Sequence, residues 1–138
     1  MKIGHTIALA YVAHGNIYRA LDEYSKILKY DPNDVYANYY TALLYEGLDS
    51  YKQAEKYYKA AIAQDSADGK IYYNYGMFLS KNSSYKKALE MLDKALEHSP
   101  YDAEILYDTG NLYIDRYYGL NYNEEKEIYD NLIFIICS

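Results

Sequence analysis

Small and apolar residues along this chain recur with the spacing of a helix. Ala20, Tyr24 and Ile27, for example, stand at positions i, i+4 and i+7, which places them on one face of a helix. Similar sets alternate with short stretches rich in Gly, Asn, Asp and Ser, a composition typical of turns. The pattern therefore predicts a succession of amphipathic helices joined by tight turns.

A second, longer period is superposed on the helical one, with the constant step that separates Ala8 from Ala42. An internal repeat of about 34 residues indicates that one supersecondary unit is copied along the chain. Six columns keep the step: Ala8, Ala42, Gly76 and Gly110; Tyr11, Tyr45, Leu79 and Tyr113; Ala20, Ala54 and Ala88; Tyr24, Tyr58 and Leu92; Ile27, Ala61 and Ala95; Pro32, Ser66 and Pro100.

Turn residues separate the predicted helices inside and between units. Pro32 and Pro100 end the outgoing helix, because proline lacks the backbone donor and clashes with the preceding turn. Asp34, Asp68 and Asp102 follow at the N-cap position of the next helix, where a carboxylate accepts unpaired amide protons. Turns are predicted within units at residues 14–16, 47–50 and 82–84, and between units at 31–34, 65–68 and 99–102.

This arrangement resembles the tetratricopeptide repeat (TPR), a helix–turn–helix unit with small, aromatic and proline residues at fixed positions. The resemblance covers the whole chain, although Gly4, Asn38, Tyr72 and Leu106 replace the family's usual Trp. It implies an all-α fold, a right-handed superhelical solenoid of antiparallel helix hairpins. We expect one domain over residues 1–138, with units at about 1–34, 35–68, 69–102 and 103–138. The matching residues are Ile7, Ala8, Tyr11, Ala20, Tyr24 and Pro32 in the first unit, Thr41, Ala42, Tyr45, Ala54 and Tyr58 in the second, and Tyr75, Gly76, Leu79, Ala88, Leu92 and Pro100 in the third.

The small residues in two of the columns are expected to let the helices of one hairpin approach closely. Gly inside a helix costs about 1 kcal/mol relative to Ala, so Gly76 and Gly110 predict that close approach outweighs this cost. The alanine column of the second helices acts from the other side, and the bulky column beginning with Tyr24 fills the space between hairpins. No hairpin buries its apolar face alone, so stability is expected to come from stacking.

The fourth unit departs from the pattern. A longer loop is predicted over residues 117–121, with about four inserted residues, and Glu125 then replaces the small Ala of the other units. The tail over residues 132–136 is more apolar than a polar cap should be. We expect a last helix folded onto the third unit; a surface for oligomer formation and a chain that continues further are the alternatives.

The first helices of successive TPR hairpins line a concave groove, and the resemblance implies that a partner binds there. Tyr, of which the chain has 22, gives large contact area with a polar tip, although AT-rich coding would also explain its abundance. The expected groove contains Tyr36, Tyr39, Tyr40 and Leu43 from the second unit, Lys70, Tyr73, Asn74 and Met77 from the third, and Glu104, Tyr107, Asp108, Asn111 and Asp115 from the fourth; the first unit would add Lys2, His5, Thr6, Leu9 and Val12.

The expected groove lacks the carboxylate clamp of Lys, Arg and Asn with which one TPR subfamily grips the C-terminal tails of heat-shock chaperones. Lys70 matches that clamp, but Asn74 stands where its Arg would be, so we expect no binding to such tails. Glu104, Asp108 and Asp115 instead put three carboxylates at one end of the groove. The hypothesis is a partner peptide or helix with basic residues; an ordinary solvated face is the alternative.

Composition and charge exclude several other classes of function. Residues 101–138 hold eight acidic and two basic side chains, which accounts for the whole net charge of −6, so no basic track for nucleic-acid phosphates is expected. The one cysteine, Cys137, allows no intramolecular disulfide or Cys-based metal cage, and the three histidines do not form a ligand cluster. No phosphate-binding loop or nucleophile elbow occurs, and no run reaches the roughly 18 apolar residues that a membrane span needs.

We therefore expect a cytoplasmic protein–protein interaction scaffold or adaptor that binds a peptide or helix of a partner in its concave groove. No catalytic residue, metal or cofactor is predicted, and the chain is not expected to be an enzyme. Two alternatives remain: a self-associating module that forms a homo-oligomer through the C-terminal helix, and a regulatory fragment of a larger protein.

Overall fold

The computed structural model describes residues 2–82, 84–118 and 122–137. Every secondary-structure element in these ranges is an α-helix, which confirms the all-α class. The helices are α1 (Lys2–Ala13), α2 (Ile17–Tyr30), α3 (Val35–Gly47), α4 (Tyr51–Ile62), α5 (Gly69–Asn82), α6 (Tyr85–His98), α7 (Ala103–Tyr118) and α8 (Tyr122–Cys137).

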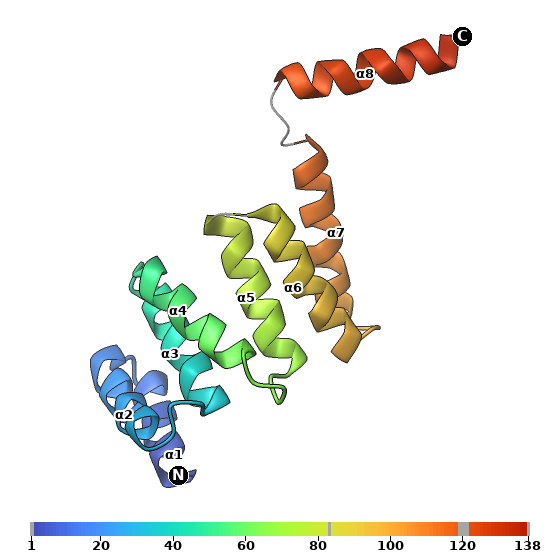
Figure 1. The fold of residues 1–138 in the computed structure, drawn as a ribbon. Helices are drawn as coiled ribbons and strands as arrows, with labels where there is room; N and C mark the ends of the chain where they lie inside the picture. The colour runs from blue at the N-terminus through green and yellow to red at the C-terminus, as the bar shows by residue number, and fades with distance from the viewer. Residues whose placement is uncertain (1, 83, 119–121, 138) are drawn as a thin grey trace.

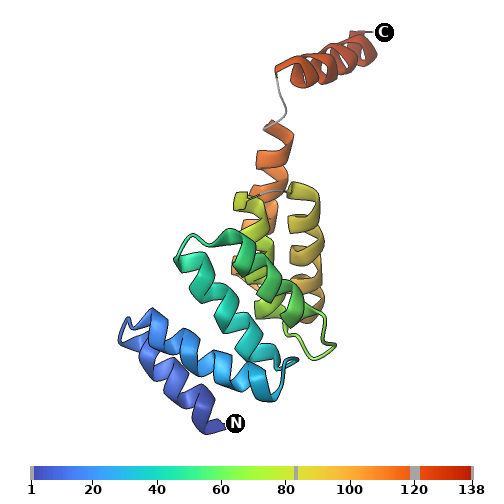
Figure 2. The same ribbon diagram turned by 60° about the vertical axis from the view of Figure 1, so that its left-hand side comes forward.

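Successive helices pair into hairpins that stack side by side (Figures 1 and 2). α1 packs against α2, α3 against α4, and α5 against α6, and each pair contacts the next through α2 and α3 or α4 and α5. α7 packs against α6 as the start of a fourth unit. The expected solenoid of helix hairpins is therefore confirmed for the first three units.

The tight turns inside the first two hairpins have the same geometry at equivalent positions of the repeat. In these two turns Gly15 and Asp49 have positive φ, at 75° and 57°. The next amide in each turn, from Asn16 or Ser50, donates to a carbonyl five residues back, at 2.8 and 2.9 Å. This is the Schellman arrangement, in which a left-handed residue ends a helix and satisfies its last carbonyls.

The predicted aspartate caps are confirmed at every unit boundary. Oδ1 of Asp34 accepts from the Ala37 amide at 2.8 Å. Oδ1 of Asp68 and of Asp102 accept in the same way from the amides three residues later, at 3.2 and 3.1 Å. Each carboxylate therefore satisfies an amide that the first turn of the helix leaves unpaired.

The columns of the second helices form the core of the first three units, as predicted. Ala20, Ala54 and Ala88 are fully buried, and so are the bulky residues that follow them four positions later. Gly76 shows why small residues are needed, because a methyl group placed on it would lie 3.0 Å from Cγ of Leu92 on the facing helix. Close helix approach is thus confirmed in the third hairpin.

Tyrosine rings supply much of the core volume and place their hydroxyls selectively. The Tyr58 ring stacks on Tyr75 with 5.1 Å between centroids, and its hydroxyl donates to Oε1 of Glu46 at 2.8 Å. The Tyr24 ring, in the same column of the first unit, stacks on Tyr40. Among the described residues the Tyr24 hydroxyl is buried without a hydrogen-bond partner, so equivalent tyrosines differ in how their polar ends are satisfied.

The fourth unit does not form the expected closed hairpin over residues 103–138. α8 lies apart from the stack (Figure 1), and the side chains of residues 130–137 are exposed. The prediction that the last helix folds onto the third unit is therefore wrong, and so is close approach at Gly110, where an added methyl group would meet nothing within 4 Å.

The loop predicted over residues 117–121 is wrong at its start, because α7 remains helical through Tyr118. Residues 119–121 lie outside the described residues. The predicted replacement of the small column by Glu125 also lies outside the described side chains.

The two equivalent tyrosines give a matched pair of substitutions. Tyr24→Phe removes a buried hydroxyl that has no partner and should raise the free energy of unfolding by about 1 kcal/mol. Tyr58→Phe removes the donor to Glu46 and should lower it by about 1.5 kcal/mol, since hydrogen bonds to charged groups are the stronger ones. Urea unfolding followed by circular dichroism measures both; an equal loss in the two variants would contradict this account of the core.

The tyrosine core also predicts loss of stability at alkaline pH. Burial is the main cause that raises the pKa of Tyr58, and the hydrogen bond to Glu46 raises it further. Burial also raises the pKa of Tyr75 to about 12. An unfolded Tyr ionises near pH 10, so the stabilisation is complete below that pH and falls as pH rises from 10 through the raised pKa, by about 1.4 kcal/mol per pH unit for each such group. Helicity and tyrosinate absorbance should change together between about pH 10 and 12; ionisation of all tyrosines with full helicity retained would refute the prediction.

Candidate functional site

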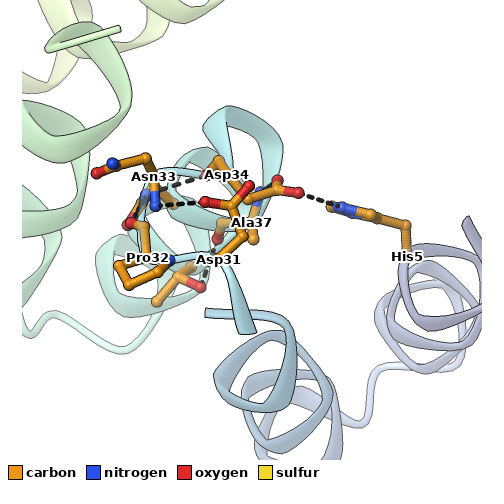
Figure 3. A network of polar contacts seen from close by, with 8 residues as sticks. His5, Asp31, Pro32, Asn33, Asp34 and Ala37 are labelled. Carbon is orange, nitrogen blue, oxygen red and sulfur yellow. Dashed lines mark hydrogen bonds and ion pairs between the residues drawn. The ribbon is translucent and has the colours of Figure 1, made fainter. Parts of the chain in front are cut away.

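Polar side chains join each odd-numbered helix to the next along one face of the stack. His5 of α1 reaches the start of α3, with 3.2 Å between its Nε2 and Oδ2 of Asp34 (Figure 3). The other oxygen of the same carboxylate caps α3 through the Ala37 amide. One aspartate therefore starts a helix with one oxygen and contacts the preceding unit with the other.

One unit later, another aspartate caps a helix and also contacts a side chain of the preceding odd-numbered helix, in this case a tyrosine. The Tyr36 hydroxyl donates to Oδ2 of Asp68 at 2.8 Å, while Oδ1 of that aspartate caps α5. This hydrogen bond, together with the charge of Asp68 and a smaller effect of burial, raises the pKa of Tyr36. Tyr36 is 47% exposed, so its ring remains available at the surface although its hydroxyl is held.

Tyr39 does not lie on the accessible surface where the sequence predicted it. It is only 2% exposed, and its hydroxyl accepts from Nδ2 of Asn74 at 2.8 Å. Its ring belongs to the core beside Tyr40, with 5.0 Å between the two centroids, so it offers little surface for the predicted contact with a partner. Its role is to fix the Asn74 amide between α3 and α5.

Tyr73 connects α5 to the acidic side chains of α7. Its hydroxyl donates to Asp108 and, at 3.4 Å, to Oε1 of Glu104. Burial is the main cause that raises the pKa of Tyr73 above its usual value, and the hydrogen bond and charge of Asp108 raise it further. Tyr73 therefore stays protonated at neutral pH as a donor, and two of the three predicted carboxylates lie around it.

Among the described residues, the groove predicted from the sequence contributes to two cavities along the odd-numbered helices. The first has a volume of about 440 Å³, and four of its residues belong to the groove predicted from the sequence. The second, about 420 Å³, lies between α1 and α3. The first is lined by Lys70, Tyr73, Asn74, Ser99, Asp102, Glu104 and Ile105, and the second by His5, Thr6, Leu9, Tyr36 and Tyr40.

The side chain of Lys2 lies outside those described, and the remaining predicted groove residues line neither cavity. Leu43 and Met77 are partly buried and pack against the core of the second and third units. On α7, Asp108 and Asn111 are partly exposed, whereas Tyr107 and Asp115 are exposed. The predicted set is thus divided into two cavities, a packed layer between them and an acidic helix face.

Sequence reasoning missed the Ser99, Asp102 and Ile105 lining of the first cavity. These residues come from the turn before α7 and its first helical turn rather than from the middle of a helix. The signal was present, because Asp102 occupies the same column of the repeat as Asp68, which holds Tyr36 one unit earlier. In the described part of the chain no three His, Cys, Asp or Glu residues are placed to hold a metal ion, and no helix there is long and apolar enough to cross a membrane.

Comparisons with known proteins agree with this geometry. A family model described as YpiA-like, C-terminal tetratricopeptide repeats matches residues 36–102. The type IV pilus assembly protein PilF of Pseudomonas aeruginosa is 30% identical over 69% of this chain and 38% of its own length. The TPR repeat-containing protein YpiA of Bacillus subtilis is 28% identical over 73% of this chain and 24% of its own length. The chain therefore spans well under half the length of these two relatives.

Among solved structures, YrrB, described as a TPR protein with an unusual peptide-binding site, superposes with a TM-score of 0.72. It is 27% identical, and the match covers 78% of this chain and 55% of YrrB.

The contact between Tyr73 and Asp108 can be measured by a double-mutant cycle. Tyr73→Phe and Asp108→Asn should couple by about 1 kcal/mol, because each removes the same charge-assisted hydrogen bond. Tyr73→Phe combined with Asp115→Asn is the matched control on the same helix, and its coupling should lie near zero. Urea unfolding gives the four free energies of each cycle; equal coupling in the two cycles would show that the Asp108 contact is not specific.

Proposed function

We propose that this chain, which belongs to the tetratricopeptide repeat family, is a protein-interaction scaffold whose odd-numbered helices bind a segment of a partner protein. The observation that carries the proposal is the pair of cavities of similar volume on that face. Both combine aromatic rings with polar groups, the composition of a surface that recognises peptides. YrrB is a similar repeat protein described as having a peptide-binding site, which supports a role in protein interaction.

The partner segment is proposed to carry basic residues. Glu104, Asp108 and Asp115 are spaced by four and seven residues, so they share one face of α7. The neighbouring cavity adds Asp102 and holds one basic side chain, Lys70. Complementary charge of this kind gives orientation and a faster association rate more than raw affinity.

The face is held in place before a partner arrives. Tyr36, Tyr73 and Asn74 each have a hydrogen bond that crosses between odd-numbered helices. Side chains that are already ordered lose less entropy on binding. This favours recognition of a flexible peptide by a rigid surface.

Repeat proteins of this family are generally scaffolds without catalytic activity, and we propose an adaptor rather than an enzyme. The single cysteine supports a reducing, cytoplasmic setting. The chain matches a small part of longer relatives, so a regulatory segment attached to other domains is the alternative that this observation favours.

Selection from a random peptide display library tests the chemistry of the partner. Peptides that bind the protein should be enriched in Lys and Arg. Their affinity should fall about tenfold, and its salt dependence should flatten, in the triple variant Glu104→Gln, Asp108→Asn and Asp115→Asn. Fluorescence anisotropy of the selected peptides at two salt concentrations measures both effects.

The matched control neutralises three exposed acids on the even-numbered helices, by Asp22→Asn, Asp93→Asn and Glu97→Gln. It changes the net charge by the same amount, so general electrostatic attraction is removed equally in the two variants. Peptide binding should survive in the control. Selection of acidic peptides, or equal losses in both triple variants, would exclude the α7 acids as the docking site.

A further inference from the structure

One face of α7 is left open, whereas the equivalent face of α1, α3 and α5 is packed against the second helix of the same unit. Its Ile105, Thr109 and Leu112 side chains are buried on the face where α7 meets α6. Leu106 and Tyr113, on the adjoining face, are 46% and 49% exposed. They belong with Gly110 to columns that in α1, α3 and α5 pack against the second helix of the same unit. We call Leu106, Gly110 and Tyr113 the α7 slot.

The space around Gly76 and Gly110, two equivalent glycines, shows how open the slot is. At Gly76 of α5 an added methyl group would lie 3.0 Å from Leu92 and 3.2 Å from the Ala88 carbonyl, because α6 is packed there. At Gly110, in the same column one unit later, nothing lies within 4 Å. The slot thus keeps the small residue that a close helix contact requires, without a helix in contact.

The part of α8 whose side chains are described, residues 130–137, is exposed. Its end carries exposed apolar side chains at consecutive positions, with Leu132, Ile133 and Ile136 at 43%, 57% and 79% exposure and Phe134 at 74%. Consecutive apolar residues surround this end of the helix, and helical surface that is apolar all round is normally buried. α8 has 16 residues, compared with 12 to 14 in the second helices of the closed hairpins.

At the position where a turn would fold α8 back onto the α7 slot of the same chain, the backbone is helical. The first two hairpins reverse at Gly15 and Asp49 through positive φ. Tyr117 occupies the column of Gly15 and Asp49 in the fourth unit, and a bulky aromatic residue disfavours that left-handed conformation. α7 accordingly continues through Tyr118 and extends beyond the neighbouring ends of α5 and α6 (Figure 1).

We propose that the α7 slot of one copy binds α8 of a second copy, in a reciprocal helix exchange. Each copy exposes the α7 slot and the apolar end of α8, the two surfaces that a reciprocal exchange would bring together. The exchange is two-fold symmetric, so it closes as a dimer and buries two equivalent slots. It does not depend on the proposed function, because Glu104 and Asp108 lie on another face of α7.

The closed third hairpin gives the register for a cross-linking test. There Gly69, the first residue of α5, lies against His98, the last residue of α6. The equivalent ends are Ala103 of α7 and Cys137 of α8, both exposed. A short bismaleimide should therefore join the thiol introduced by Ala103→Cys to Cys137 of the other copy.

The expected product is a covalent dimer on a denaturing gel, with mass spectrometry locating the bridge between positions 103 and 137. Wild-type protein, whose only thiol is Cys137, and the double variant Ala103→Cys with Cys137→Ser show the background. A bridge within one chain, or no bridge above background, overturns the exchange.

A second variant tests the slot without touching α8. Gly110→Leu adds a side chain where nothing lies within 4 Å, so the isolated copy should keep its helicity while docking is blocked. Light scattering across a concentration series should show dimerisation weakened at least about tenfold. Gly47→Leu is the matched control, since Gly47 is also helical and open, and it should dimerise like the wild type. A wild-type monomer at all concentrations, or unimpaired dimerisation of Gly110→Leu, refutes the proposal.

Discussion

The first helix of each unit needs two helical neighbours, and this requirement governs the whole structure. One neighbour is the second helix of its own unit, and the other is the second helix of the preceding unit. Ala37, Ile71 and Ile105 make the latter contact in successive units and are all buried. Ile3 occupies the same column in α1 and is 76% exposed, because no described helix precedes it. Apolar surface in such a stack is satisfied only by neighbours.

The aspartates between units connect this stacking to the candidate site. Asp34 and Asp68 each use one oxygen to begin a helix and the other to hold a side chain of the preceding odd-numbered helix. A cap is a local requirement of helix formation, so the sequence must keep it whatever the partner is. The polar groups of the binding face are therefore positioned by the same residues that position the helices.

The core could be predicted from the repeat period because each core column keeps the same small or bulky character. The binding face could be predicted only in part. His5, Tyr39 and Tyr73 share one column, yet Tyr39 is buried while the other two are partly exposed. This column lies at the border between core and surface, where exposure depends on the neighbouring rings, here Tyr40 beside Tyr39. The repeat period identifies which residues share a column, but it does not determine how deeply a ring at the border between core and surface is buried.

The fourth unit shows that closing a hairpin depends on its turn as well as on its helix faces. α7 repeats the small residue at Gly110 and the aromatic residue at Tyr113, so its face is suited to a second helix. The left-handed position held by Gly15 and Asp49 is held here by Tyr117, for which that conformation is costly. Continuing α7 through this position adds a helical hydrogen bond for each residue and avoids that cost, but it leaves the apolar faces of both helices uncovered. Local backbone preference and burial thus oppose each other at this one turn, whereas in the first two units they agree.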